Sequence, residues 1–264
     1  MIKKDRMDLL LAIDIGNTTT DIGLFENRRF TRKVKISSKA SALDVLKLIK
    51  RLCKPSDPCK ARAIISSVAP VSLKNVEKVL KTGIGIRPIV VGRHVKVPIR
   101  NLYEKPLQVG QDRLVAAYAC KQLYNVPAII IDFGTAITFD LVNSKGEYEG
   151  GLITPGAGMA LEALAEKTAL LPKVSLKCPK RLIGKNTVES IRSGIINGLS
   201  GMCSALVSRL KCKKRESMFV LATGGLCRIM TKYSKCIDNI DENLILKGLC
   251  LIYYRKTSYK QLIR

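Results

Sequence analysis

Residues 9–21 read LLLAIDIGNTTTD, and residues 127–140 read PAIIIDFGTAITFD. In each stretch an apolar, strand-forming run leads into Asp-x-Gly, and small or hydroxyl-bearing residues then lead into a second strand. Asp14 and Gly16 therefore correspond to Asp132 and Gly134. Two copies of a strand–turn–strand unit this far apart predict two domains of the same architecture.

The composition is that of a globular protein and excludes several kinds of site. The chain has 264 residues, of which 47% are hydrophobic and 25% charged, far from the disordered class. It holds a single histidine, His94, which excludes multi-histidine metal sites and makes Ser/His/Asp catalysis improbable. No apolar run reaches the roughly 18–20 residues that cross a bilayer.

The cysteines and the N-terminal apolar run predict a cytoplasmic protein. The nine cysteines contain no C-x-x-C pair, which favours reduced thiols over a disulfide framework or a zinc ribbon. The run Leu9–Ile13 ends at Asp14 and is too short for a secretory signal.

The formal net charge of +25 is spread over both halves of the chain. Such a field attracts phosphates, nucleic acid and acidic membranes, although a solvated basic surface gives the same count. No basic run alternates with aromatic residues, so we expect no membrane partner and no specific nucleic-acid partner, only weak non-specific nucleic-acid binding at low salt.

Short β-rich runs alternate with amphipathic helical patterns, which predicts an α/β fold. The expected strands cover residues 9–14, 20–26, 30–36, 61–66, 88–91, 128–132, 137–143, 148–153, 218–222 and 236–240. The expected helices cover residues 41–52, a segment from about 72, 112–124, 159–171, 187–210 and 242–255.

The two Asp-x-Gly turns are typical of phosphate-binding loops. Glycine lets backbone N–H groups point outward, and an aspartate at a strand end can hold Mg²⁺, often through water. A third glycine turn, Thr223–Gly225, follows the apolar run FVLA. Ordinary hairpin turns remain the alternative for each motif taken alone, and none matches a Walker A or G-x-G-x-x-G pattern.

In sequence order, these motifs resemble those of the actin-like ATPase superfamily and, more closely, of the type III pantothenate kinases. The matching segments are Asp14–Thr18, Asn101-x-Tyr103-x-x-Pro106, Gly110–Arg113, Asp132–Ala136, Gly150-Gly151, Pro155-Gly156, Gly184–Thr187 and Thr223–Gly225.

This resemblance implies an α/β fold of two ribonuclease H-like (actin-like ATPase) domains with a nucleotide cleft between them, divided into residues 1–120 and 121–264. It implies a kinase that uses ATP with Mg²⁺ and a monovalent cation, K⁺ or NH₄⁺, to phosphorylate pantothenate in the first step of coenzyme A biosynthesis. It also implies a homodimer whose subunits share each pantothenate site.

The resemblance also implies residue roles, each with a structural alternative. Asp112 would be the general base for the pantothenate hydroxyl, or the cap of a helix. Arg113 would hold the substrate carboxylate, or form a surface salt bridge. Tyr103 would close over the substrate, or pack in the core. Thr187 would reach the substrate of the neighbouring subunit, or cap the helix that carries Gly194, Gly198 and Gly201, the face expected at the dimer interface.

The remaining site residues are implied in the same way. Gly110 and Gln111 complete the substrate segment. Asp14 would orient magnesium through water, and Asp132 would contribute to the monovalent-cation site. The expected ATP-binding residues are Asp14, Ile15, Gly16, Asn17, Thr18, Thr19, Thr20, Asp21, Gly134, Thr135, Thr223, Gly224 and Gly225.

Two departures and two alternatives stay open at this point. Gln111 stands where the family has a smaller residue, and the first loop places no lysine beside the phosphates. The alternatives are a catalytically silent regulatory or nucleic-acid-associated relative, and a kinase of another small hydroxyl substrate. The presence of Asp112 and its Gly and Arg neighbours argues against both.

Overall fold

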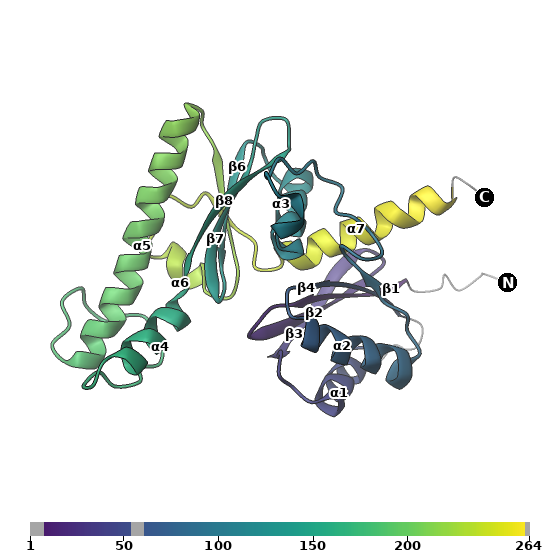
Figure 1. The fold of residues 1–264 in the computed structure, drawn as a ribbon, viewed down its shortest axis with the longest axis horizontal. Coiled ribbons are helices and arrows are strands. Elements are labelled where there is room, and N and C mark those ends of the chain that lie inside the picture. The colour runs from purple at the N-terminus through teal and green to yellow at the C-terminus, as the bar shows by residue number, and fades with distance from the viewer. Residues whose placement is uncertain (1–7, 54–60, 262–264) are drawn as a thin grey trace. The chain divides into compact units, whose positions relative to one another are not determined.

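The computed structural model describes residues 8–53 and 61–261 and contains two compact units (Figure 1). Of the described residues, the first unit comprises those up to Ile99, Lys105–Gln122 and those from Leu244 onward, and the second comprises Arg100–Glu104 and Leu123–Asn243. The predicted division put residues 121–264 together, whereas here the last helix belongs to the first unit.

A five-stranded mixed sheet organises the first unit, in the order β3-β2-β1-β4-β5. β1 pairs antiparallel with β2 and parallel with β4. The strands are β1 (Leu9–Ile15), β2 (Thr19–Glu26), β3 (Arg29–Ser37), β4 (Arg62–Ser67) and β5 (Ile89–Val90).

Alternate residues of β1 face opposite sides of this sheet, and both sides are covered. Ile13 and Ile15 join a core with residues of α1 (Ala42–Leu52), α2 (Pro70–Lys78) and the π-helical turn Val79–Ile84. The opposite face is packed by α7 (Leu244–Gln261). This helix also approaches α3 (Gln111–Leu123) closely, since a Cβ at Gly248 of α7 would lie 2.7 Å from the carbonyl oxygen of Val115 in α3. The contacts of α7 with β1, β2 and β4 explain why the last helix belongs to this unit.

The second unit repeats the sheet of the first, in the order β8-β7-β6-β9-β10. β6 pairs antiparallel with β7 and parallel with β9, as β1 does with β2 and β4. The strands are β6 (Ala128–Phe133), β7 (Ala136–Val142), β8 (Tyr148–Pro155), β9 (Phe219–Thr223) and β10 (Asn239–Ile240). The predicted duplication is therefore confirmed at the level of topology.

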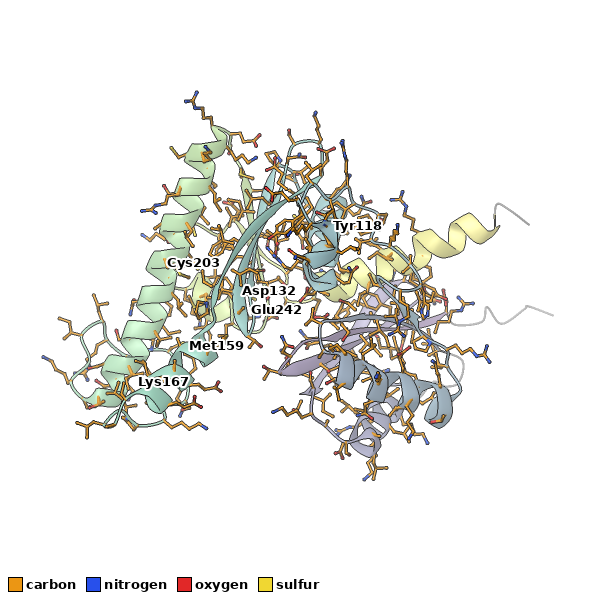
Figure 2. All side chains as sticks on the ribbon, viewed as in Figure 1. Tyr118, Asp132, Met159, Lys167, Cys203 and Glu242 are labelled. Atoms are coloured by element: carbon orange, nitrogen blue, oxygen red, sulfur yellow. The ribbon has the colours of Figure 1, made fainter. Side chains whose placement is uncertain are left out.

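The long helix α5 (Thr187–Lys214) packs on this second sheet, and Cys203 lies on its buried side (Figure 2). α4 (Ala157–Lys167) contacts α5, and Leu161 of α4 packs with Ile191 of α5 in a separate small core. The sequence did not predict α6 (Cys227–Thr231) or the 3-10 turn Pro106–Gln108. Both are a single turn or little more, too short for a periodic pattern.

The other strands and long helices were predicted within a few residues, except that α7 runs on to Gln261, past the predicted end at 255. Ser41 caps α1 as predicted, since its hydroxyl accepts from the N–H of Asp44 at 3.2 Å. No helix in the described part of the chain is long and apolar enough to cross a membrane.

Candidate functional site

The first Asp-x-Gly turn is closed by its own backbone and held by Ser38, the residue that follows β3. The N–H of Gly16 donates to the carbonyl of Thr19 at 3.0 Å, and the hydroxyl of Ser38 donates to the carbonyl of Gly16 at 2.7 Å. The side chains of Asn17 and Thr18 are exposed at the tip. This geometry leaves the tip available to a ligand.

Two residues predicted for this loop lie inside the fold instead. The side chain of Ile15 is fully buried in the core. Thr20 is buried and its hydroxyl lies 3.0 Å from that of Ser38. Ile15 therefore shapes the loop through packing, and Thr20 does so through its contact with Ser38, a residue that the sequence did not single out.

Asp14 stands in a row of polar residues that crosses the first sheet. Strand register places it opposite Asp21 of β2 and opposite Ser66 of β4, and Asp21 is in turn opposite Lys35 of β3. Residues paired in this way point to the same face of a sheet. The Lys35 ammonium lies 3.4 Å from the Asp21 carboxylate, so the structure brings a lysine into a row where the loop sequence alone supplied none.

Two atoms of this row are buried without a hydrogen-bond partner, namely Asp21 Oδ1 and Ser66 Oγ. Such atoms are normally satisfied by water or an ion. They stand on the two strands that flank Asp14. Magnesium usually keeps several of its waters, so oxygen atoms on both sides of one carboxylate fit a hydrated magnesium ion. Among the described residues, no group of three or more His, Cys, Asp or Glu side chains could hold a metal.

Asp112 is the second residue of α3, so it is not the cap residue of the helix. Its Oδ1 accepts from the N–H of Arg113 at 2.8 Å, which satisfies one of the free donors of the first turn. Desolvation by burial raises the pKa of Asp112 above its ordinary value, while the N–H and the guanidinium of Arg113 act in the opposite direction. A carboxylate with a raised pKa is suited to accept a proton.

Val68 connects the first loop with Asp112. Its N–H donates to the carbonyl of Ile15 at 3.0 Å. A Cβ at Gly110 would lie 3.5 Å from Val68 Cγ1 and 2.5 Å from Asp112 Oδ1. The structure thus brings the Asp14 turn and the Gly110–Arg113 segment to one end of the same sheet.

In the second unit, two glycine-containing segments pack against the turn that begins at Asp132. A Cβ at Gly224, whose φ is +86°, would overlap Asp132 Oδ1 and lie 2.7 Å from the nitrogen of Phe133. A Cβ at Gly156 would overlap the carbonyl of Thr135. Only glycine allows these approaches, so the Asp132–Ala136, Pro155-Gly156 and Thr223–Gly225 motifs form one assembly, with Thr135 exposed on it.

Tyr103 belongs to the second unit, whereas Asp112 belongs to the first. Its segment docks on β8, since the N–H of Tyr148 donates to Arg100 and the N–H of Leu102 donates to Tyr148, both at 2.8 Å. The Tyr103 ring lies against Gly150, where a Cβ would be 3.3 Å from Cδ2. Tyr103 is half-buried, so the alternative of a core tyrosine is wrong.

The helix cap assigned to Thr187 is wrong, because Asn186 caps α5. The Asn186 side chain accepts from the N–H of Glu189 at 2.9 Å. Thr187 is exposed in the first turn, and its hydroxyl is not used as the cap. A Cβ at Gly194, Gly198 or Gly201 would meet nothing within 4 Å, so within the described chain there is open space beside these three glycines.

The folds of solved structures define the class of protein. The chain matches an (R)-2-hydroxyglutaryl-CoA dehydratase component A from Acidaminococcus fermentans with a TM-score of 0.57 at 11% identity, covering 95% of this chain and 99% of that one. It also matches a Baf-family protein described as a transcriptional activator from Campylobacter jejuni (TM-score 0.56, 17% identity, 94% and 99% covered) and MreB 5 of Spiroplasma citri (0.52, 11%, 97% and 98%). The chain has the actin-like ATPase fold, with duplicated sheets that carry paired Asp-x-Gly turns.

Sequence comparisons then give the family. The family model described as type III pantothenate kinase matches residues 10–209. Two curated relatives carry the name "Type III pantothenate kinase": one from Myxococcus xanthus, 38% identical over 252 residues (94% of this chain, 98% of the relative), and one from Moorella thermoacetica, 37% identical over 254 residues (94% and 100%). The chain belongs to the type III pantothenate kinase family, and the family predicted from the motifs is confirmed.

Proposed function

We propose that this chain transfers the γ-phosphoryl group of ATP to the primary hydroxyl of pantothenate, with Asp112 as the general base. The observation that carries this proposal is the placement of a desolvated carboxylate at the start of α3, at the same end of the sheet as the Asp14 turn. Asp112 accepts the hydroxyl proton as the hydroxyl oxygen attacks the phosphorus. Because the family has the actin-like ATPase fold, ATP and a divalent metal are its expected cofactors.

The first unit supplies the phosphate loop. Asn17 and Thr18 are exposed at its tip and would bind phosphate oxygens, while Asp14, Asp21 and Ser66 would hold a hydrated magnesium ion. Bound magnesium neutralises charge that develops on the phosphate oxygens. The unpartnered Oδ1 of Asp21 and Oγ of Ser66 support this assignment.

The second unit supplies the other nucleotide contacts. Gly134 and Thr135 face the phosphates, and Thr223–Gly225 approaches the adenosine end. Asp132 contributes to a site for K⁺ or NH₄⁺. The close approach of Gly224 to Asp132 supports a shared binding surface for these segments.

The pantothenate site uses Tyr103, Arg113 and, from the second subunit of a homodimer, Thr187. Arg113 suits the substrate carboxylate because its guanidinium presents a planar fork of donors. The open face of α5 at Gly194, Gly198 and Gly201 supports the dimer. So do the exposed apolar side chains of Leu170, Leu182 and Ile183 in the same unit, which are 91%, 72% and 71% exposed.

The cytoplasm is the proposed location. Three free and buried cysteines, Cys120, Cys203 and Cys250, have pKa values raised to about 12 by burial. Thiols of this kind are unreactive packing groups and suit a reducing compartment.

The deciding experiment measures ADP release with pantothenate, with and without K⁺, for the wild type and for Asp112→Asn. We expect the variant to lose about 10²–10⁴-fold in kcat, the usual contribution of a general base. Asp44→Asn is the matched control, because Asp44 also lies in the first turn of a helix of the same unit, and it should keep wild-type turnover.

A measurement of the stability of Asp112→Asn distinguishes a loss of catalysis from a loss of folding. Since the folded-state pKa of Asp112 is raised, this group favours the folded state at low pH and loses that contribution as pH rises through its folded-state pKa. Asp112→Asn should therefore be at least as stable as the wild type at neutral pH. Near-normal turnover in Asp112→Asn would show that Asp112 is not the general base. Turnover with other acceptors but not with pantothenate would show that the proposed substrate is wrong.

A further inference from the structure

A turn outside the recognised motifs lies against the start of α3. Gly92 has φ +84°, and a Cβ there would lie 3.0 Å from Cδ, 3.2 Å from Cγ and 3.3 Å from Oε1 of Gln111. Gln111 is the first residue of α3 and precedes Asp112. The enlarged residue at position 111 is thus accommodated because Gly92 has no side chain.

The turn that carries Gly92 is fixed by its backbone. The N–H of Gly92 donates to Val95, and the N–H of His94 donates to Val90, both at 2.8 Å. The N–H of Val90 donates to Nδ1 of His94 at 2.9 Å. The N–H of Val91 donates to Ile65 of β4 at 2.9 Å, so the turn is tied to the strand that carries Ser66.

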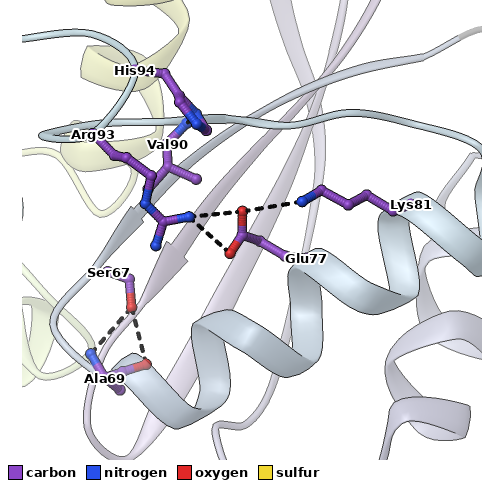
Figure 3. Close-up of polar contacts among 7 residues, drawn as sticks. All are labelled: Ser67, Ala69, Glu77, Lys81, Val90, Arg93 and His94. Atoms are coloured by element: carbon purple, nitrogen blue, oxygen red, sulfur yellow. Dashed lines mark hydrogen bonds and ion pairs between the residues drawn. The ribbon is translucent and has the colours of Figure 1, made fainter.

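A buried carboxylate anchors the same turn from α2. Glu77 is only 7% exposed, and both of its oxygens lie 3.1 Å from Nη1 of Arg93, the residue after Gly92 (Figure 3). Lys81, one helical turn further on, lies 3.8 Å from Oε1 of Glu77. A buried carboxylate is costly unless it is paired, so Glu77 holds Arg93 in place.

We propose that Glu77, Arg93 and Gly92 position the catalytic base: the anchored turn supports Gln111, and Gln111 fixes the first turn of α3 so that the Asp112 carboxylate points at the substrate hydroxyl. This inference rests on the proposed role of Asp112. Glu77, Arg93 and Gly92 are positioning residues, because they act on the reaction only through Gln111. A displacement near 1 Å can cost a reaction about 10²-fold, so support of this kind has a measurable effect.

The first test inserts a methyl group into the contact. Gly92→Ala should lower kcat about tenfold or more, leave the KM for ATP near its wild-type value, and move the acid limb of the kcat–pH profile. The matched control is Gly85→Ala, because Gly85 has nearly the same backbone strain, φ +82°, but nothing within 4 Å of its Cβ position. The double variant Gly92→Ala/Gln111→Ala removes the collision with the Gln111 side chain but keeps the backbone strain at position 92. If the collision alone displaces the helix, the pH profile of the double variant returns toward that of Gln111→Ala.

The second test leaves the glycine intact. Arg93→Met and Lys81→Met each remove one cation from Glu77, but only Arg93 belongs to the turn. We expect a lower kcat and a shifted pH profile in Arg93→Met, neither in Lys81→Met, and partial recovery in Arg93→Lys. This pair decides the proposal if Gly92→Ala does not fold.

The outcomes distinguish this proposal from the function on which it rests. If Asp112→Asn is inactive while Gly92→Ala matches Gly85→Ala and Arg93→Met matches Lys81→Met in kcat and pH profile, the positioning proposal is overturned and the base stands. If Asp112→Asn remains active, the base itself is wrong.

Discussion

The two units share one sheet topology but differ at the point where chemistry is expected. In the first unit the row across the strands is Asp21–Asp14–Ser66, flanked by Lys35. In the second unit the topologically equivalent row is Thr138–Asp132–Thr223, flanked by Ile153. Both rows therefore keep a central aspartate and a hydroxyl-bearing residue on the parallel neighbour strand, Ser66 or Thr223, whereas Asp21 of the first unit corresponds to Thr138 of the second.

The turns after the fourth strand differ as well. In the second unit the backbone of Gly224 approaches Asp132 directly. In the first unit Ser67 occupies the corresponding position, its hydroxyl accepts from the N–H of Ala69 at 3.1 Å, and α2 follows at once (Figure 3). One unit thus uses close backbone approach beside its aspartate, and the other uses side chains.

The largest loss of unfolding free energy among these variants is expected at Gly224. Gly224→Ala combines a left-handed backbone with overlap on the Asp132 carboxylate and the Phe133 backbone, which together cost about 4 kcal/mol. Ser67→Ala, at the corresponding position, loses the two hydrogen bonds between the Ser67 hydroxyl and the Ala69 backbone and should cost about 1–2 kcal/mol. Urea unfolding of both variants measures the difference. Similar losses would show that the two turns do not differ in this way.

A second prediction concerns the buried carboxylate of the second sheet. Asp140 is 1% exposed and accepts from Tyr148 at 2.8 Å and from Thr138 at 2.9 Å. Asp140→Ala takes this acceptor from both hydroxyls and should cost about 3 kcal/mol of unfolding free energy. Glu26→Ala in the first unit, which loses an exposed pair with Arg32 at 3.5 Å, should cost less than about 0.5 kcal/mol. A loss below 1 kcal/mol for Asp140→Ala would contradict the prediction.

The pH dependence of kcat tests whether Val68, the residue after Ser67, helps to desolvate Asp112. Val68 and Asp112 Oδ1 approach the same point at Gly110, so Val68→Ala should admit water and lower the raised pKa of Asp112 toward its ordinary value. Because the base acts when deprotonated, the acid limb of kcat should move to lower pH. Val71→Ala, at a position 83% exposed, should leave the limb unchanged. A limb that stays in place in Val68→Ala would mean that other groups desolvate Asp112.

The smallest effect on stability is expected at Ser66. Ser66→Ala removes a buried hydroxyl that has no hydrogen-bond partner, so the unfolding free energy should stay constant or rise by up to about 1 kcal/mol. The Mg²⁺ concentration that gives half-maximal activity should rise in the same variant. A clear loss of stability with unchanged Mg²⁺ dependence would assign Ser66 to the fold and not to the metal.

Much of the site could be predicted because its motifs are local. Asp14, Gly16, Asp132 and Gly134 lie in strand–turn–strand segments, whose alternation and turn residues are visible in the sequence. The neighbours that complete the site could not be found in this way. Ser66 and Lys35 reach the Asp14 row only through strand pairing between segments far apart in the chain.

The sequence by itself determined the duplicated architecture, the family and the identity of the glycine turns, because backbone conformation and hydrophobic alternation are properties of neighbouring residues. Three features became clear only from the packing of the whole chain: the last helix joins the first sheet, Asn186 and not Thr187 caps α5, and Gly92 makes room for Gln111 beside Asp112. The physical reason is that each of these depends on which distant segments pack together, and packing is selected by the whole chain.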